Sequence, residues 1–331
     1  MDVKQDTPLI ETRHLKKYFQ VGRNSLLHAV DDVDIRIDRG DTLGIVGESG
    51  CGKSTLGRTI IRLLNPTSGE ILLNGNDIAN YSEHQMRSVR RDMQIIFQDP
   101  YSSINPRMTV AEIIAQPMLV YKEFNNKADL YKRVAGLMNT VGLAARLYDA
   151  YPHELDGGRR QRIGIARALA LNPKFIVCDE PVSALDVSIQ AQILNLLMDL
   201  QDEYKIAYMF ITHDMSVVKH ISDEIAVMYL GQCIEKCHAK ELFRNPLHPY
   251  TKMLLTAIPK PNLSSRLKMD SVIKGEVTNP IDPSPGCRFA PRCEFASEEC
   301  RTVNPAFCEI EPNHYCACHK VIREMKGGLQ E

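Results

Sequence analysis

The chain has 331 residues, a length that suits one large domain with an extension rather than a single small domain. Its 40 basic residues nearly balance its 41 acidic ones, which argues against a protein whose main partner is a nucleic acid. No apolar run approaches the roughly 18 residues of a membrane span, and the first residues lack the apolar stretch of a signal peptide. We therefore expect a cytosolic chain.

The N-terminal part predicts two strands with one solvated face. Residues 9–19 and 29–37 alternate apolar and polar side chains, as such strands do. Tyr18 lies near the end of the first of them. Its ring could stack on a purine base, or it could pack on the core as an ordinary edge-strand tyrosine.

A glycine-rich stretch lies between a predicted strand and a predicted helix. Residues 43–46 form a short apolar run, and residues 53–64 carry leucine and isoleucine on one helical face. The stretch between them fits the pattern G-x-x-x-x-G-K-[ST]. Backbone N–H groups of such a turn converge on an anion at the start of the helix. We predict a phosphate site in which Lys53 meets the β- and γ-phosphates and the Ser54 hydroxyl meets Mg²⁺. Its residues are Gly47, Glu48, Ser49, Gly50, Cys51, Gly52, Lys53, Ser54 and Thr55.

The following stretch predicts two strands and then a helical insertion. Residues 69–75 predict a strand that ends in an Asn-Gly turn, and residues 93–98 a buried strand that ends in Gln98. Asp-Pro and Asn-Pro pairs then interrupt the pattern. From residue 110 to about residue 150 the periodicity is helical throughout. We expect a helical subdomain, about residues 99–158, inserted into an α/β core.

A second glycine turn and a strand that ends in two carboxylates come next. Residues 155–162 form a glycine turn that opens a helix, and residues 174–180 an apolar strand that ends in Asp179 and Glu180. In a phosphate-loop site an aspartate at such a strand end holds Mg²⁺. Glu180 could orient or deprotonate the attacking water. A solvated strand end is the alternative interpretation of this pair.

One histidine follows another buried strand, residues 207–212. His213 would lie at the edge of a parallel sheet where ligands bind. Its spacing alone favours an ordinary surface histidine.

Six of the ten cysteines crowd the end of the chain. In a reducing compartment such a cluster favours metal binding over disulfides. The gaps Cys287-x5-Cys293 and Cys293-x6-Cys300 are longer than the C-x2–4-C pairs of most zinc sites. The six are Cys287, Cys293, Cys300, Cys308, Cys316 and Cys318.

Taken together, the motifs of residues 8–258 resemble those of an ATP-binding cassette (ABC) transporter ATPase. The resemblance implies ATP and Mg²⁺ as ligands, and a RecA-like P-loop NTPase core with an antiparallel β-subdomain and the helical insertion. It also implies that two such chains sandwich two ATP molecules, each between the phosphate loop of one chain and the signature of the other. The residue roles that it implies are adenine stacking by Tyr18, contact with Mg²⁺ and the attacking water by Gln98, the signature at Asp156, Gly157 and Gly158, Mg²⁺ binding by Asp179, the catalytic base at Glu180, the interface loop at Asp186 and a γ-phosphate switch at His213.

Two further segments narrow the resemblance. Residues 97–110 and 245–251 are similar to the oligopeptide/dipeptide importers, and most of all to their F-type subunit, one of two non-identical ATPases. This likeness implies a peripheral protein on the cytoplasmic face of the membrane that hydrolyses ATP to ADP and phosphate. It also implies a second ATPase subunit, two transmembrane permeases and an indirect extracytoplasmic binding protein as partners, with no nucleic acid.

Other functions remain open at this point. Nickel importers share the architecture, so the transported solute is not settled. A soluble ABC ATPase that acts on nucleic acid or ribosomes is an alternative from another class. We would then expect long coiled-coil insertions or two cassettes in one chain, and the sequence contains neither.

The likeness also bears on residues 259–331, expected to form a Cys-rich extension. Related importer ATPases carry a similar set of cysteines, assigned in some members to a [4Fe–4S] cluster, which needs four thiolates. On that pattern the ligands would be Cys287, Cys293, Cys300 and Cys318. Cys308 or Cys316 could replace one of them, and zinc or free thiols are the alternatives.

The signature departs from the family pattern. The usual Leu-Ser-Gly-Gly-Gln is replaced by residues 155–159, Leu-Asp-Gly-Gly-Arg. An ionised Asp156 cannot donate to a phosphate as serine does, and like charges at ~4 Å repel by up to about 4 kcal/mol. Arg159 could offset part of this repulsion; alternatively, Asp156 simply caps the helix. We expect the site built with Asp156 to turn over slowly, and a partner ATPase to carry an intact signature.

Overall fold

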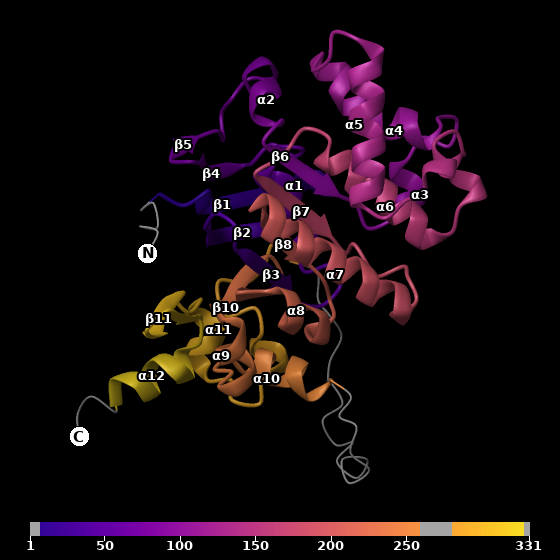
Figure 1. The fold of residues 1–331 in the computed structure, drawn as a ribbon. Coiled ribbons are helices and arrows are strands. Elements are labelled where there is room, and N and C mark those ends of the chain that lie inside the picture. Colours follow the sequence, from indigo (N-terminus) through magenta and orange to yellow (C-terminus); the bar gives the residue numbers. More distant parts are fainter. Residues whose placement is uncertain (1–6, 259–279, 328–331) are drawn as a thin grey trace, which may run out of the picture. The chain divides into compact units, whose positions relative to one another are not determined.

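A computed structural model describes residues 7–258 and 280–327 of the chain (Figure 1). The chain forms two compact units. The first comprises Met1–Arg36, Thr42–Ala79 and Thr212–Glu331, and the second comprises Ile37–Asp41 and Asn80–Ile211. The predicted boundary between residues 258 and 259 falls at the edge of the described residues.

The first unit contains an antiparallel sheet near the N-terminus. Its strand order is β2-β1-β4-β5, and β4 pairs antiparallel with both β1 and β5. The strands are β1 (Ile10–Gln20), β2 (Leu26–Ile37), β4 (Ser68–Leu73) and β5 (Asn76–Asp77). The predicted Asn-Gly turn is confirmed, because Asn74 and Gly75 connect β4 to β5 with φ of 50° and 80°.

A second group of strands in this unit runs in the order β11-β12-β10-β9-β3. β3 and β9 are parallel, while the other pairs are antiparallel. These strands are β3 (Thr42–Val46), β9 (Glu224–Tyr229), β10 (Gln232–His238), β11 (Cys308–Glu311) and β12 (His314–Cys316). Residues near the end of the chain are thus hydrogen-bonded into the sheet that carries the strand before the glycine-rich stretch.

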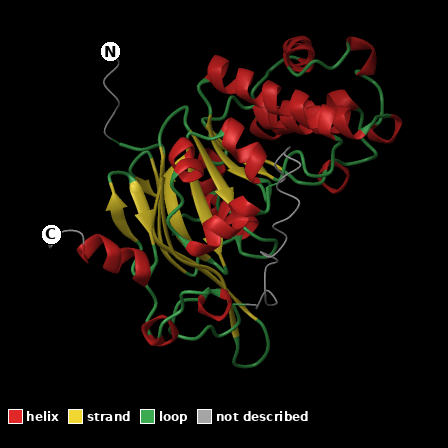
Figure 2. Cartoon of the chain, turned by 90° about the horizontal axis from the view of Figure 1, so that it is seen from below, coloured by secondary structure: helices red, strands yellow, loops and turns green. Residues whose placement is uncertain are grey.

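Helices accompany these strands. In Figure 2 the last helix before the C-terminus, α12, lies beside the strands, and it contacts β11. The helices of the first unit are α1 (Lys53–Ile60), α8 (Met215–Ile221), α9 (Ala239–Arg244), α10 (Pro249–Thr256), α11 (Glu298–Thr302) and α12 (His319–Gly327), with a short 3-10 helix η4 (Ala290–Arg292).

The second unit combines parallel strands with a group of helices. Its strands β6 (Met93–Ile96), β7 (Phe175–Asp179) and β8 (Ala207–Ile211) lie side by side in that order. Helices α4, α5 and α6 contact one another, as the magenta part of Figure 1 shows. The helices are α2 (Glu83–Val89), α3 (Pro100–Ser103), α4 (Val110–Tyr121), α5 (Lys127–Thr140), α6 (Gly157–Leu169) and α7 (Val187–Tyr204), with 3-10 turns η1 (Ala145–Leu147) and η2 (Pro152–Glu154).

The structure places helix ends that periodicity alone did not locate. The helical stretch predicted over residues 110–150 is divided: α4 ends where Lys122 turns left-handed at φ 55°, and Asn126 then caps α5. The helix predicted over residues 53–64 ends at Ile60. Beyond it Arg62 has φ 55°, and its guanidinium donates 2.6 Å hydrogen bonds to the carbonyls of Ile78 and Ala79. Local capping and a buried arginine, rather than hydrophobic spacing, set these ends.

The core of the first unit includes a residue from the C-terminal segment. The Phe289 ring lies 5.3 Å from the Tyr229 ring and 5.5 Å from the Tyr250 ring, and the two tyrosine rings lie 4.7 Å apart. All three side chains are buried in the same cluster as Val46 and Leu242. Aromatic rings in such edge-on contacts stabilise a core beyond the area that they bury. The C-terminal segment is therefore part of the first unit's core.

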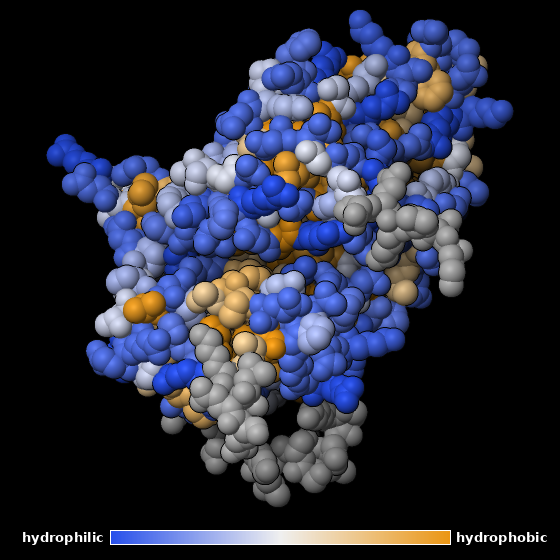
Figure 3. All heavy atoms as spheres, turned by 90° about the vertical axis from the view of Figure 1, so that its left-hand side faces the viewer, coloured by the Kyte–Doolittle hydropathy of each residue, from blue (hydrophilic) through white to orange (hydrophobic). Residues whose placement is uncertain are grey.

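Most of the face shown in Figure 3 is hydrophilic, with apolar side chains in scattered patches. Within residues 7–258 and 280–327, no helix has both the length and the apolar character needed to cross a membrane.

A buried glutamate joins three segments of the first unit. Glu235 on β10 is fully buried, and its carboxylate accepts hydrogen bonds from the backbone N–H groups of Leu247 (2.7 Å) and His248 (2.9 Å). The His314 Nε2 atom on β12 lies 2.8 Å from the same carboxylate. Glu235 thus provides the hydrogen-bond acceptors for the two backbone N–H groups that lie just before α10.

We expect Glu235→Gln to lower the free energy of unfolding by about 1–3 kcal/mol, because the amide nitrogen cannot accept a hydrogen bond from these donors. Urea denaturation monitored by circular dichroism measures the change. Glu70→Gln, at a side chain that is 51% exposed, should stay within about 0.5 kcal/mol of the wild type. Equal stability of the two variants would contradict this role of Glu235.

Candidate functional site

The glycine-rich stretch forms a tight turn between β3 and α1, as predicted. Gly47, Gly50 and Gly52 have φ of 152°, 78° and 104°, a range that side chains rarely adopt. A Cβ atom on Gly52 would lie 2.0 Å from the carbonyl oxygen of Ala29, and one on Gly47 would lie 2.2 Å from that of Met228. Both positions therefore require glycine for backbone conformation and for space.

The lysine of this turn is held inside it. Lys53 is buried, and its ammonium group donates 2.8 Å hydrogen bonds to the carbonyl oxygens of Gly47 and Glu48. Gly52 precedes the first helical residue of α1, so the start of α1 follows the turn directly. A helix N-terminus, a curled glycine turn and a lysine together make an anion site.

Tyr18 lies on β1 within a polar network. Its ring stacks on the ring of His28, with centroids 3.9 Å apart and planes 18° apart. Its hydroxyl donates a hydrogen bond to Asp31 on β2. Burial and this hydrogen bond raise the pKa of Tyr18 above its usual value. The proposed adenine-stacking ring is thus half of a stacked pair, and the sequence analysis missed the histidine.

The carboxylates of β7 lie in the second unit. Asp179 is fully buried at the end of the strand. Glu180 follows with φ 48°, and its backbone N–H donates a 3.0 Å hydrogen bond to Ile211. The Gln98 amide donates a 2.7 Å hydrogen bond to the Glu180 carboxylate. The structure therefore brings together two of the residues that the resemblance placed around the attacking water.

Asp156 caps helix α6. Its carboxylate accepts a 2.8 Å hydrogen bond from the backbone N–H of Arg159 and pairs at 3.0 Å with the guanidinium of the same residue. A Cβ atom on Gly158 would lie 2.7 Å from the Ile189 side chain, so this glycine packs closely on α7. The capping interpretation is confirmed, and Arg159 forms an ion pair with the Asp156 carboxylate.

Asp186 has the same role at the next helix. It caps α7 and accepts hydrogen bonds from the Ile189 N–H (3.0 Å) and the Ser188 hydroxyl (2.8 Å), which lower the pKa of Asp186. His213 lies two residues after the end of β8 and belongs to the first unit, as do Tyr18 and the glycine-rich turn.

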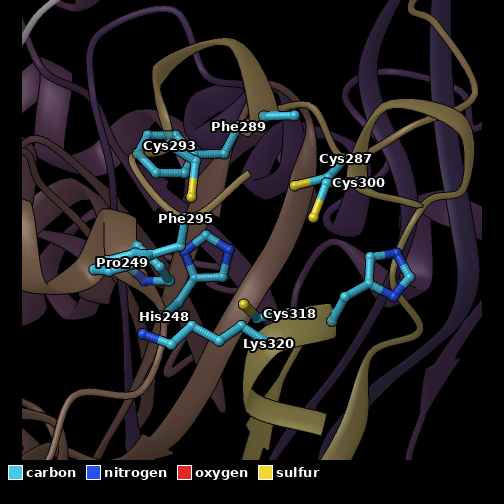
Figure 4. A pocket seen from close by; sticks show the side chains of 11 residues that line it. His248, Pro249, Cys287, Phe289, Cys293, Phe295, Cys300, Cys318 and Lys320 are labelled. Carbon is cyan, nitrogen blue, oxygen red and sulfur yellow. The ribbon is translucent and has the colours of Figure 1, made fainter. Parts of the chain in front are cut away.

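The four cysteines that the resemblance indicated as ligands line one pocket of the first unit. Cys287, Cys293, Cys300 and Cys318 all border it, and Figure 4 shows their sulfur atoms around a common space. Burial raises the pKa of Cys287 to about 11 and also raises that of Cys293. The electrostatic interaction with Cys300 and Cys318 adds to both pKa shifts, so the four thiols lie close enough to affect one another's ionisation.

Two further cysteines lie outside this pocket. Cys308 and Cys316 face each other across β11 and β12. Of the residues that the structure describes, no three His, Cys, Asp or Glu are arranged as a metal-holding group.

Two arginines next to the pocket cysteines Cys287 and Cys293 were not predicted from the sequence. Arg288 pairs with Asp31, and Arg292 pairs with Glu48. The partners are 257 and 244 residues apart in the sequence, so no local pattern could reveal them.

Comparison with known families gives two matches. The ABC transporter family matches residues 30–183, and the family described as the oligopeptide/dipeptide transporter C-terminal region matches residues 234–300.

Several proteins are similar over nearly the whole chain. The oligopeptide transport ATP-binding protein AppF of Bacillus subtilis is 48% identical, covering 96% of this chain and 99% of its own. OppF of Salmonella typhimurium, also named an oligopeptide transport ATP-binding protein, is 47% identical, with coverage of 96% and 98%. The dipeptide transport ATP-binding protein DppF of Haemophilus influenzae is 45% identical, with coverage of 97% and 99%.

Solved structures of cassettes share the fold. The ATP-binding cassette MJ0796, determined as a dimer in a post-hydrolysis state with ADP and Pi, has a TM-score of 0.64 and 28% identity, covering 70% of this chain and 98% of its own. The protein cbiO1 of Clostridium perfringens, part of the transporter complex cbiONQ, has a TM-score of 0.65 and 29% identity, covering 72% and 92%. The predicted α/β P-loop fold is therefore confirmed.

We expect Gly52→Ala to abolish detectable ATP binding and to destabilise the chain, because its Cβ atom would lie 2.0 Å from the Ala29 carbonyl oxygen. Gly22→Ala is the matched control, since Gly22 has nearly the same φ, 107°, but a Cβ atom there would have no neighbour within 4 Å. Its free energy of unfolding should fall by only about 1–2 kcal/mol, the cost of a left-handed backbone for a residue with a side chain. Its ATP affinity should equal that of the wild type. Titration calorimetry and urea denaturation measure both quantities; equal ATP affinities of the two variants would contradict the role of this close contact.

Proposed function

Because the chain belongs to the family of ATP-binding proteins of oligopeptide and dipeptide ABC transporters, we propose that it is the ATP-hydrolysing subunit of a peptide importer. The observation that carries this proposal is the joint match to the cassette and to the peptide-transporter C-terminal region in one chain. Relatives named for oligopeptide or dipeptide transport are similar from end to end. Nickel or another small solute is the alternative cargo for the same architecture.

In this proposal the first unit binds the phosphates and the base of ATP. The backbone N–H groups of the glycine turn and the start of α1 face the phosphate oxygens, and Lys53 neutralises the β- and γ-phosphates. Ser54, Asp179 and Gln98 are the residues that would hold Mg²⁺, and His213 is the one that would contact the γ-phosphate. Tyr18, already stacked on His28, presents an aromatic surface to adenine. The remaining loop residues Glu48, Ser49, Gly50, Cys51 and Thr55 complete the cradle.

Hydrolysis is assigned to Glu180 and Gln98. Glu180 accepts the proton of the water that attacks the γ-phosphorus, and the β–γ bond breaks to leave ADP and phosphate. The hydrogen bond from Gln98 fixes the direction of the Glu180 carboxylate. Positioning of this kind supplies most of the rate in phosphoryl transfer.

We assign the chain to a pair with a second, non-identical ATPase, held against two permeases on the cytoplasmic face of the membrane. Asp156, Gly157 and Gly158 would face the ATP bound by that partner. The Asp156 carboxylate brings a negative charge toward phosphate, and the ion pair with Arg159 offsets only part of it because both side chains are about half exposed. The site built with Asp156 therefore turns over more slowly than the one that contains Glu180. An extracytoplasmic binding protein delivers the peptide to the permeases.

The assembled complex, purified from detergent extracts, provides the test. We expect recovery with two permeases, and ATP hydrolysis that rises when a peptide-loaded binding protein is added. Glu180→Gln should remove most of this hydrolysis, since a positioned base contributes about 10²–10⁴-fold. The exposed Glu203→Gln, in the same unit, is the control and should change nothing.

Two results would overturn these assignments. Hydrolysis that survives Glu180→Gln but disappears when the partner's equivalent acid is replaced would reverse the asymmetry. Recovery with ribosomes instead of permeases would exclude transport.

For the C-terminal pocket we propose a [4Fe–4S] cluster bound by Cys287, Cys293, Cys300 and Cys318. Four thiols around one space are the donor set that such a cluster needs. When bound, the cluster would supply either a structural link or one-electron redox chemistry. The thiols must lose their protons on binding, so the raised pKa of Cys287 makes assembly favour higher pH.

We expect chain purified without oxygen to contain about four iron atoms and to show visible charge-transfer absorption. Cys287→Ser should lose both, while Cys308→Ser, outside the pocket, should keep both. Metal analysis and absorption spectroscopy measure this. Zinc in place of iron, or no metal in the wild type, would contradict the proposal, and loss of iron in Cys308→Ser would reassign a ligand.

A further inference from the structure

Arg292, in the C-terminal segment, holds the phosphate loop through Glu48. Its two terminal nitrogens donate hydrogen bonds of 2.7 and 2.8 Å to the two carboxylate oxygens of Glu48. Arg292 is 3% exposed and Glu48 17%, so water screens this pair little. The Glu48 backbone N–H also donates a 2.9 Å hydrogen bond to the Tyr250 hydroxyl. The residue after Gly47 is thus fixed by both its side chain and its backbone.

Arg288 is linked to the other part of the proposed ATP site, the stacked rings of Tyr18 and His28. It pairs with Asp31, and it donates a hydrogen bond to the carbonyl oxygen of Leu230. Asp31 in turn accepts from the Tyr18 hydroxyl and lies 3.2 Å from the His28 ring nitrogen. Burial alone would raise the pKa of Asp31, but the hydrogen bonds from Tyr18 and His28 and the charge of Arg288 lower it. The carboxylate therefore stays ionised and links the arginine to the stacked rings.

Both arginines are sequence neighbours of cysteines that line the pocket. Arg288 follows Cys287, and Arg292 precedes Cys293. A single short turn joins them, in which Ala290 N–H bonds to the Cys287 carbonyl at 3.0 Å and Cys293 N–H bonds to the Ala290 carbonyl at 3.3 Å. Each of the two guanidinium groups is therefore carried by the residue next to a pocket cysteine.

We propose that Arg288 and Arg292 are positioning residues of the nucleotide site, and that they make ATP affinity depend on the state of the cysteine pocket. Arg292 sets the phosphate loop through Glu48, and Arg288 sets the Tyr18–His28 stack through Asp31. Neither arginine needs to touch ATP. The inference rests on the proposed function in taking ATP as the ligand of this site.

The two arginines should affect different parts of the ligand, and this distinguishes positioning from general support of the fold. Inorganic tripolyphosphate carries the phosphates without the base. Arg292→Met should weaken binding of both ATP and tripolyphosphate by about tenfold, the loss of one charge-assisted contact. Arg288→Met should weaken ATP binding by a similar factor but leave tripolyphosphate within about twofold, because only the base platform is disturbed. General loosening of the fold would weaken both ligands in both variants.

The test is titration calorimetry on the full chain, at temperatures well below each variant's melting temperature. Arg323→Met, a 59% exposed arginine of the same segment, is the matched control and should bind both ligands as the wild type does. Arg292→Lys keeps the charge and one contact, so it should recover part of the affinity. Glu48→Gln combined with Arg292→Met should be no weaker than Arg292→Met alone, since both changes remove the same pair.

Cysteine variants test the link to the pocket. Cys293→Ser should weaken ATP and tripolyphosphate binding, as Arg292→Met does, while Cys308→Ser should weaken neither. Unchanged affinities in Arg292→Met, or equal losses for both ligands in Arg288→Met, would overturn the inference while leaving the proposed function intact. Failure of the wild-type chain to bind ATP would instead overturn the proposed function. Unchanged ATP affinity in Cys293→Ser would overturn the coupling to the pocket.

Discussion

The constraint on which the nucleotide site depends is the close backbone packing of the glycine-rich turn. Gly52 lies against the Ala29 carbonyl of β2, and Gly47 against the Met228 carbonyl of β9, at distances that leave no room for a side chain. Two strands from distant parts of the sequence thus shape one turn. The convergence of backbone N–H groups on an anion, the direction of Lys53 and the start of α1 all follow from this shape.

The local half of the site could be predicted from the sequence, because its chemistry lies in contiguous residues. The strand, glycine turn and helix start around Gly47 were predicted, and the cap at Asp156 was one of two interpretations. The contacts that hold the turn in place could not be predicted, because they join residues more than two hundred positions apart: Arg292 with Glu48, and Arg288 with Asp31. Hydrophobic periodicity also did not show where helices end: the helix predicted over residues 53–64 stops at Ile60, and α4 stops before Lys122.

The cysteines show a similar division. The resemblance to importer ATPases pointed to the four that line one pocket, but the sequence could not show that Cys308 and Cys316 are paired across β11 and β12. The sequence also could not show that Phe289, which lies between two pocket cysteines, packs with Tyr229 and Tyr250 in the core of the first unit. The described part of the C-terminal segment is therefore packed into the first unit, which also carries the phosphate loop.

Hydrogen exchange at the amides of residues 47–53 tests most directly whether the phosphate loop is held from the C-terminal segment. The contact between Arg292 and Glu48 predicts faster exchange at these amides in Arg292→Met than in the wild type, with exchange in the β1–β2 sheet unchanged. Arg323→Met should exchange as the wild type does. Wild-type exchange across the loop in Arg292→Met would contradict the account.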